Sequence, residues 1–310
     1  MRERVRHPGR TAVLLTGILV ATLCVSAPLA SAPSPNNPAA LPRGWGWLLA
    51  AGTVSGFDAN AGTATLAITG QARGATYEGG AQWRPQAVTG SQVVHVLPST
   101  VISDTGNQPL TIAAIRPGLP ATVWAVMKPD TSMLGLKVRL GSGSRQPPAS
   151  PITEAPAGVT GAVMHATVSM LEVLTAQGAP RKVIVTSATT IRNASGAVLR
   201  SAAIAPYDIL RVEGTVNSDG SVAATRVDVE MEAATAPQVS GSVDQVFEDV
   251  GGLVIGGVAV AIVPGCYYFK GSGPGAWPQL VPGQPAVAYG APIVSGNTLL
   301  GLRARVVAMR

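Results

Sequence analysis

The sequence is poor in the residues that most often carry catalysis or bind metals. Its 310 residues include 3 His and 2 Cys, while 12% are charged and 4% are aromatic. Beyond the N-terminal segment the two His are His95 and His165, and they lie in separate alternating segments. Histidine is a frequent general base and metal ligand, and zinc needs three or four clustered ligands. The composition therefore predicts neither a metal site nor a cofactor.

Sequence motifs of common enzymes are missing as well. The chain has no Gly-x-Ser-x-Gly nucleophile motif and no phosphate loop that ends in Gly-Lys-Ser/Thr. The glycine-rich segments 251–257 and 271–275 are not followed by a helical pattern, so they predict hairpin turns. We therefore expect a protein that is not an enzyme and has no catalytic residues.

The N-terminal segment has the pattern of an export signal. Four Arg lie within the first ten residues, an apolar run extends from Thr11 to Ala27, and Ala30-Ser31-Ala32 resembles a cleavage site. The pattern predicts a signal peptide over residues 1–32 and a Pro/Asn-rich linker over 33–50. We expect an exported protein in the periplasm, on the cell surface or outside the cell.

Two alternatives to a cleaved signal stay open at this stage. The apolar run is close to the roughly 17 residues that a membrane span requires, so an uncleaved anchor is one alternative. A lipid anchor on Cys24 is the other, although Leu23 stands where bacterial lipoproteins normally have a small residue. Either would attach the protein to a membrane through its N-terminus.

Removal of the signal changes the arguments from charge and cysteine. The net charge of +6 loses four Arg and one Glu, which leaves 18 basic and 15 acidic groups and a net charge of +3. Basic residues that are this few and scattered singly do not predict nucleic-acid binding. Cys266 is the one cysteine left, so packed cores rather than an internal disulfide must stabilise the protein.

The remaining chain reads as short strands joined by turns, with 36 Gly and 25 Pro. The clearest example is a hairpin in which apolar and charged residues alternate over 209–216 and again over 222–229. Asn217-Ser218-Asp219-Gly220 between them favours a chain reversal. This pattern predicts a half-buried antiparallel pair.

The same outline occurs three times along the chain, as in a repeat protein. Each unit opens with Val-Ser/Thr-Gly, continues to a three-residue middle strand, and reaches a proline about 15, 15 and 13 residues after the end of that strand in units 1, 2 and 3. The predicted middle strands begin at Thr100, Thr189 and Tyr267, and the prolines are Pro117, Pro206 and Pro282. The predicted organisation is unit 1 over 51–140 with an insertion over 71–91, a Gly/Ser/Pro linker over 141–157, unit 2 over 158–232, a linker over 233–237, and unit 3 over 238–310.

The residues of unit 2 carry a resemblance to a known family. The segments Leu210–Gly214 and Asp219–Val227 resemble bacterial domain-of-unknown-function family 5666, which matches units 1 and 3 more weakly. The resemblance implies exported proteins with tandem domains that form small OB-like barrels. It has no catalytic residues to transfer. The predicted fold is therefore all-β, with three tandem small OB-like barrels or sandwiches after the signal segment.

Two sets of aromatic and basic residues are candidates for partner binding. Tyr77, Trp83 and Arg84 lie in the glycine-rich insertion, which is either a plain surface loop or a binding loop. Tyr267 and Tyr268 belong to the densest aromatic run, which forms either barrel core and edge or a stacking platform. Alternation places Cys266 and Tyr268 on one face, with Tyr267 and Phe269 on the other.

These observations favour a non-enzymatic envelope or extracellular protein whose barrels bind an unknown envelope protein or polymer. One rival is a hydrolase of envelope polymers that uses Asp208, Glu213 and Asp228, the closest set of carboxylates. Alternation places Glu213 and Asp228 on the wet face, which disfavours this reading. A purely structural spacer is the other rival.

Overall fold

The protein is all-β, as predicted. The computed structural model describes residues 45–68, 72–79, 82–86, 88, 90–141, 158–296 and 298–310. The predicted signal peptide, most of the first linker and the predicted linker over 141–157 lie outside these residues. Within them, no helix has the length and apolar character needed to cross a membrane.

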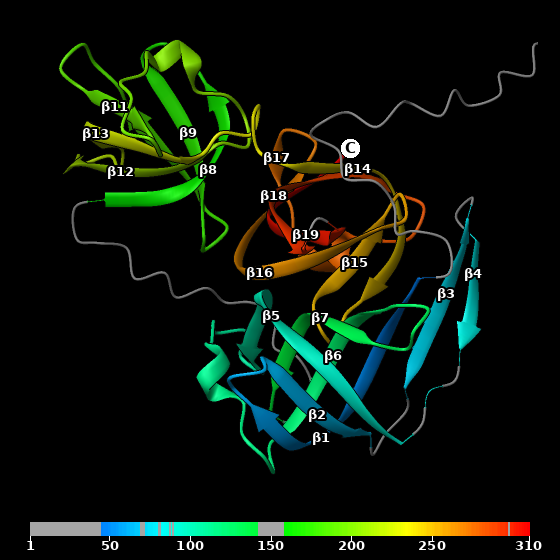
Figure 1. Cartoon of the computed structure of the whole chain (residues 1–310). Helices are drawn as coiled ribbons and strands as arrows, with labels where there is room; N and C mark the ends of the chain where they lie inside the picture. Colours follow the sequence, from blue (N-terminus) through cyan, green and yellow to red (C-terminus); the bar gives the residue numbers. More distant parts are fainter. Residues whose placement is uncertain are drawn as a thin grey trace, which may run out of the picture. The chain divides into compact units, whose positions relative to one another are not determined.

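The strands form three sheets, which are coloured in chain order in Figure 1. The first, barrel 1, contains β1 (Gly46–Asp58), β2 (Thr63–Ile68), β3 (Arg73–Gly79), β4 (Gln82–Gln86), β5 (Ser91–Asp104), β6 (Pro120–Met127) and β7 (Met133–Leu140). Barrel 2 contains β8 (Gly158–Ala166), β9 (Met170–Thr175), β10 (Pro180–Ile184), β11 (Thr190–Asn193), β12 (Ile209–Val216) and β13 (Val222–Met231). Barrel 3 contains β14 (Gln238–Phe247), β15 (Gly252–Ile255), β16 (Val258–Lys270), β17 (Gly273–Pro274), β18 (Pro285–Ser295) and β19 (Thr298–Met309).

All three sheets close in the same order. The five strands of the ring are, in chain order, β1, β2, β5, β6 and β7 in barrel 1, β8, β9, β10 with β11, β12 and β13 in barrel 2, and β14, β15, β16, β18 and β19 in barrel 3. The first of these strands pairs with the second and the fourth, the second with the third, and the fourth with the fifth. The third and fifth strands are parallel and close the ring: β5 with β7, β10 and β11 with β13, and β16 with β19. Five strands in this arrangement are the OB-like barrel that was predicted. A short 3-10 turn precedes the fourth strand of each barrel: η1 (Ile112–Ala114), η2 (Ser201–Ala203) and η3 (Trp277–Gln279).

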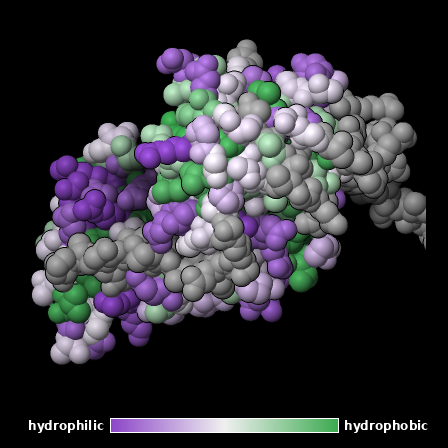
Figure 2. Space-filling view, turned by 90° about the horizontal axis from the view of Figure 1, so that it is seen from below, coloured by the Kyte–Doolittle hydropathy of each residue, from purple (hydrophilic) through white to green (hydrophobic). Residues whose placement is uncertain are grey.

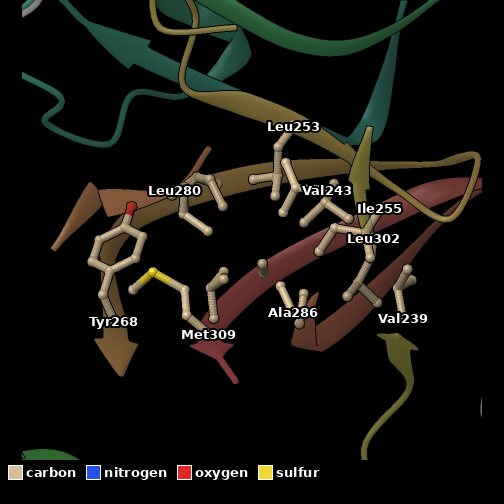
Figure 3. Packing of buried hydrophobic residues seen from close by; sticks show 14 of the residues in the cluster. Val239, Val243, Leu253, Ile255, Tyr268, Leu280, Ala286, Leu302 and Met309 are labelled. Carbon is tan, nitrogen blue, oxygen red and sulfur yellow. The ribbon is translucent and has the colours of Figure 1, made fainter. Parts of the chain in front are cut away.

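The interior of each barrel is filled by the alternating apolar residues of its strands. In barrel 3, side chains from β14, β15, β16, β18 and β19 converge, with Tyr268 and Met309 at one end of the cluster and Val239 and Ile255 at the other (Figure 3). Barrels 1 and 2 have separate interior clusters of the same kind. Each unit therefore has its own hydrophobic core.

The insertion of barrel 1 forms a hairpin instead of the loop that the sequence predicted. β3 pairs with the first four residues of β1, and β4 pairs with β3. Tyr77 and Trp83 are aromatic residues that favour strands, and glycine between them permits the reversal. β1 itself begins at Gly46, inside the predicted linker, because Trp47, Leu48 and Leu49 are buried strand residues.

The proline turn before the fourth strand is the same in all three barrels, as the sequence indicated. After the proline, the N–H of Gly118, Tyr207 and Gly283 donates to the carbonyl oxygen of Val54, Val163 and Val243, respectively, at 2.7–2.8 Å. The φ angles of these three donors are +87°, +74° and +87°. Glycine adopts this conformation easily, whereas Tyr207 does so at a cost of about 1–3 kcal/mol.

The last hairpin turn is also shared by barrels 1 and 2, although their sequences differ. In barrel 2, Asp219 Oδ1 accepts hydrogen bonds from the Ser221 hydroxyl at 2.6 Å and the Ser221 N–H at 3.0 Å. Asp130 and Ser132 form the same pair in barrel 1, with Thr131 at a φ of +66° in place of glycine. The hydrogen bonds from Ser221 and Ser132 lower the pKa of both carboxyls.

The pairing of the third strand with the fifth is interrupted at one point in every barrel, and in barrels 1 and 2 a threonine side chain bridges the interruption. In barrel 1, Thr100 Oγ1 donates to the carbonyl oxygen of Gly135 at 2.7 Å and accepts from the N–H of Leu97 at 2.8 Å. In barrel 2, Thr189 does the same with Ala224 at 2.7 Å and Thr186 at 3.0 Å. These hydroxyls tie the third strand to the fifth.

The register places Cys266 at the corresponding position of barrel 3. Tyr267 pairs with Val306 just as Val101 pairs with Lys137 in barrel 1. The residue of barrel 3 that corresponds to Thr100 and Thr189 is therefore Cys266, one residue before the start of the middle strand that the sequence suggested. The thiol occupies the position of the bridging hydroxyl, and its contact at 3.7 Å is with the carbonyl oxygen of the next residue, Tyr267.

We predict that Thr189→Val lowers the free energy of unfolding by about 1–3 kcal/mol, because Ala224 O and the Thr186 N–H lose their partner. Thr215→Val, at an exposed position in the same barrel, is the control and should change it by less than about 0.5 kcal/mol. Urea unfolding of the whole chain measures both. Equal effects of the two variants would refute the bridging role.

Candidate functional site

Each barrel has one face that corresponds to the usual ligand face of OB-like barrels. It consists of the second and third strands with the loops that follow the first and fourth strands, and OB-like barrels commonly bind ligands there. The strand register identifies matching residues on this face. His95, Ile184 and Ala261 correspond on the third strands, and they pair with Thr63, Met170 and Gly252 on the second strands.

In barrel 3 this face is covered by barrel 1. Phe247 lies 4.6 Å from Trp47 and 5.2 Å from Trp124, measured between ring centroids. The apolar cluster between the two barrels consists of Trp47, Leu49, Val101, Trp124, Val126, Leu134 and Leu136 from barrel 1 with Phe247, Val250, Val254, Ala259, Ala261, Ile293 and Leu300 from barrel 3. The outer surface of barrel 1 thus packs on the face of barrel 3 that corresponds to the usual ligand face of OB-like barrels.

A tryptophan and a lysine form the centre of this contact. A Cβ on Gly252 would overlap the Trp124 ring, so the ring rests directly on the backbone of barrel 3. Lys137, which pairs with Trp124 across β6 and β7, is 1% exposed. Its ammonium donates to the carbonyl oxygen of Ile262 at 2.6 Å and to that of Gly251 at 3.4 Å. Barrel 3 therefore contacts an aromatic ring and a cation that barrel 1 of the same chain supplies.

The sequence analysis missed this contact, although a signal for it was present. Every residue of β7 and all but the first of β6 are buried, so both faces of these strands are covered. Strands that are covered on both sides have continuous apolar runs rather than alternation. The run Ala121–Met127 is of this kind.

Gly252→Ala should weaken the contact between barrels 1 and 3, because its methyl group would displace the Trp124 ring. We expect the free energy of unfolding to fall by about 1–3 kcal/mol, which is typical of overpacking. Gly273→Ala is the matched control, since its added methyl would meet its nearest atom at 3.8 Å. Chemical denaturation followed by tryptophan fluorescence distinguishes them, and an unchanged Gly252→Ala variant would contradict the packing.

In barrel 1 the matching region is a groove of about 840 Å³. Its walls are the loop after the first strand, the third strand, the segment around η1, the loop after β6, and Ser295 of barrel 3. The lining residues are Ala59, Asn60, Ala61, Gly62, His95, Val96, Leu97, Pro98, Thr100, Ile102, Leu110, Thr111, Ile112, Lys128, Ser132, Leu134 and Ser295. This volume lies within the roughly 300–1,000 Å³ of typical small-molecule sites.

The groove combines an apolar wall with a single ammonium group. Its lining within the described residues includes Lys128 and no Asp or Glu, and the Asp130 carboxylate, which accepts from the Ser132 hydroxyl, lies close enough to Lys128 to feel its charge. The Lys128 Nζ lies 5.7 Å from the centroid of the Trp45 ring, which positions the cation by a cation–π contact. Hydroxyls of Thr111, Ser132 and Ser295 add polar groups. The arrangement suits a ligand that has an apolar part and a negative charge.

In barrel 2 the same region is lined by exposed apolar side chains. Met170 and Ile184 form a cross-strand pair and are 37% and 38% exposed. Val168 in the preceding turn and Val216 at the end of β12 are also exposed. The surface view mixes hydrophobic and hydrophilic residues on the side that it shows (Figure 2).

The predicted binding residues of the insertion come together along the backbone of the hairpin. Tyr77 is the cross-strand partner of Trp83, and Thr76 is the partner of Arg84. Their role in binding stays a prediction.

The predicted binding residues of barrel 3 are buried within the chain. Tyr268 is part of the barrel 3 core, while Tyr267 faces outward into a cluster with residues of barrel 2. This confirms the predicted alternation around Cys266. Burial raises the pKa of Tyr267 to about 12. Both rings pack against the protein itself, which was the alternative to a stacking platform.

Barrels 2 and 3 touch, as their short linker indicated. The Tyr207 ring stacks on Tyr289 at 5.5 Å and meets the edge of Phe269 at 5.0 Å. Arg305 of barrel 3 forms an ion pair with Glu230 of barrel 2 at 2.8 Å. The contact explains why Tyr207 stands at a positive φ where the other barrels have glycine.

Of the three carboxylates of the hydrolase hypothesis, Asp208 is set apart from Glu213 and Asp228, which share Arg226 as a neighbour. Asp208 is 2% exposed, and its two oxygens accept hydrogen bonds from the N–H of Ala205 and of Ala233, each at 2.8 Å. Asp228 forms an ion pair with Arg226 at 3.0 Å, and Glu213 lies opposite Arg226 on the outer face. Asp208 therefore joins the proline turn to the linker. Among the described residues, no three His, Cys, Asp or Glu side chains gather as metal ligands would.

Burial raises the pKa of Asp208 above its ordinary value of 3.8, against the opposing effect of its two backbone hydrogen bonds. The folded state therefore favours the protonated carboxyl, and this group's contribution to stability falls as the pH rises from 3.8 through the folded-state pKa.

At neutral pH we predict that Asp208→Asn lowers the free energy of unfolding by about 1–3 kcal/mol, since the amide NH₂ group would face a backbone N–H. The difference between wild type and variant should be larger at acidic pH. Asp228→Asn on the outer face should cost at most about 1 kcal/mol. Denaturation curves between pH 3 and 7 test this, and a difference that grows with pH would contradict the sign.

Residues 162–228 match the family described as "Domain of unknown function (DUF5666)". Residues 162–228 form a DUF5666 domain. The match begins in β8 and ends in β13, so the DUF5666 domain coincides with barrel 2. The hydrogen-bond pairing of barrels 1 and 3 gives them the same strand order as barrel 2.

Other comparisons add little to this assignment. No curated protein matches the sequence. Among solved structures, one described as "drosophila Unr CSD456" is similar at 10% identity and a TM-score of 0.18, covering 81% of this chain and 91% of the other. The OB-like assignment rests on the strand pairing described above.

Proposed function

We propose that this protein is a non-enzymatic module of the cell envelope or extracellular space that binds a protein or polymer partner through the groove of barrel 1. The observation that carries the proposal is that equivalent faces of barrels 1 and 3 differ, since one is a groove and the other is filled. Barrel 3 has this face filled by Trp124 and Lys137 of the same chain. Barrel 1 has a groove of about 840 Å³ there.

Export is the other part of the proposal, and it is supported by the sequence alone. The Arg-rich start, the apolar run and the small-residue cleavage pattern have the order of a signal peptide. Export would bring the groove into contact with envelope proteins and wall polymers.

Retention of the full mature chain, residues 33–310, on purified envelope fractions and wall polymers tests the proposal. Lys128→Glu reverses the charge of the groove and should lower the retained fraction about tenfold, equivalent to ~1.4 kcal/mol of binding free energy. Lys270→Glu makes the same change at an exposed residue at the end of β16 and should leave retention unchanged.

The outcomes separate the rival functions. A wild-type protein that is not retained by any fraction would favour the structural spacer. Equal losses in both variants would show that retention follows net charge rather than the groove. Release of soluble fragments from a polymer would favour the hydrolase, and Asp228→Asn would then be the first variant to assay.

A further inference from the structure

The groove of barrel 1 and the contact with barrel 3 lie on the same face of the β6–β7 hairpin. Along β6, Trp124 and Val126 belong to the apolar cluster between the two barrels. Met127, which stands between Val126 and Lys128, belongs instead to the interior cluster of barrel 1. Since side chains of a strand alternate between its two faces, Lys128 follows Trp124 and Val126 on the face that meets barrel 3. Lys128 is also a lining residue of the groove.

Some side chains of barrel 1 belong both to the groove and to the contact with barrel 3. Leu134 of β7 is the cross-strand partner of Val126, and it lies in the cluster between the barrels while it also lines the groove. Leu97 of the third strand packs against the same cluster and lines the groove as well. The groove is therefore the open end of the contact between barrels 1 and 3.

Barrel 3 supplies part of the groove wall. Ile293 of β18 and Leu300 of β19 are 0% and 1% exposed and belong to the cluster between the barrels. Ser295, the last residue of β18, follows Ile293 by two positions and lines the groove. Where Ser295 stands relative to the other lining residues thus depends on how barrel 3 packs on barrel 1.

The contacts that fix this packing lie outside the groove. The Trp124 ring rests on Gly252, where a methyl group would overlap it. The Lys137 ammonium donates to the carbonyl oxygen of Ile262 at 2.6 Å, a charge-assisted hydrogen bond that depends on the position of barrel 3. Within the described residues, neither Trp124 nor Lys137 lines the groove. Changes at these two contacts can therefore move barrel 3 without altering a lining residue.

We infer that the groove is a joint site of barrels 1 and 3, so that ligand binding in it and the docking of the two barrels stabilise each other. This inference rests on the proposed function, because it concerns the regulation of the same groove. A ligand that contacts Leu97 and Leu134 on one side and Ser295 on the other binds the docked arrangement. Coupling of this kind is reciprocal, so a change that weakens docking also weakens binding.

A bulky residue on the barrel 3 side of the groove tests whether the site is shared. Binding is measured as retention of the full mature chain on the envelope or polymer fraction that retains the wild type. Ser295→Trp fills the wall that barrel 3 supplies and should lower the retained fraction about tenfold. Ser272→Trp is the matched control, because Ser272 is an exposed turn residue of barrel 3 outside the groove lining, and it should leave retention unchanged.

Lys137→Glu tests the coupling from outside the groove. Its carboxylate would face the carbonyl oxygens of Ile262 and Gly251, which repels barrel 3 from its position. We expect retention to fall by about five- to 150-fold, the usual range of such coupling. NMR should show shifted resonances of His95 in the groove and unchanged resonances of His165 in barrel 2. Ser295→Trp, which leaves barrel 1 unaltered, decides the matter if Lys137→Glu unfolds barrel 1.

The contrary results separate this inference from the proposed function. If Lys128→Glu lowers retention while Ser295→Trp and Lys137→Glu leave it unchanged, barrel 1 binds alone, so the inference is wrong and the proposed function stands. Equal effects of Ser295→Trp and Ser272→Trp would also refute the joint site. A loss with Ser295→Trp but not with a folded Lys137→Glu variant would refute the coupling to docking. If Lys128→Glu leaves retention unchanged, the groove is not the binding site and both proposals fail.

Discussion

Each barrel depends on the parallel pairing between its third and fifth strands. These strands are separated in the sequence by the 3-10 turn and the fourth strand, so the ring cannot close until the end of the unit is in place. The pairing of the third strand with the fifth is interrupted at one point, where Thr100 or Thr189 bonds to the fifth strand in barrels 1 and 2. The interior cluster and the direction of every outward side chain follow from this closure.

Closure also leaves the five strands of each barrel without the unpaired sheet edges that would otherwise invite aggregation, whereas β4 of the insertion hairpin stands at the edge of its sheet. What remains for interaction is the outer surface of the strands, and the three barrels use it differently. In barrel 3 the face is covered by Trp124 of barrel 1, which contacts Phe247, while barrel 1 has a groove and barrel 2 exposes Met170 and Ile184. One fold therefore hosts different surfaces, so function has to be argued from the site.

Much of the fold could be predicted from the sequence, because local patterns determine it. Alternation identified the hairpin of β12 and β13, and the prolines marked turns whose geometry is the same in all three barrels. The hairpin over β3 and β4 was missed, since its glycine-rich sequence has weak alternation. Thr131 could form the same turn as Gly220 because the carboxylate of Asp130 fixes the loop.

The candidate site was harder to predict for a physical reason. The groove is formed by loops and Ser295 from opposite ends of the sequence, and its residues are ordinary types such as Ala59 and Leu97. Nothing local distinguishes them. Tyr267 and Tyr268 were conspicuous as an aromatic run, but large aromatic residues are as frequently used for packing between barrels as for binding.

The contact between barrels 1 and 3 has a consequence for the order of folding. A ribosome releases the N-terminus first, so barrel 1 can close before barrel 3 exists. The surface around Trp47 and Trp124 then faces water while all of barrel 2 is being made, until Phe247 and the strands after it arrive. During that interval the nascent chain exposes the apolar surface around these tryptophans, and exposed apolar surface of this kind is prone to aggregation.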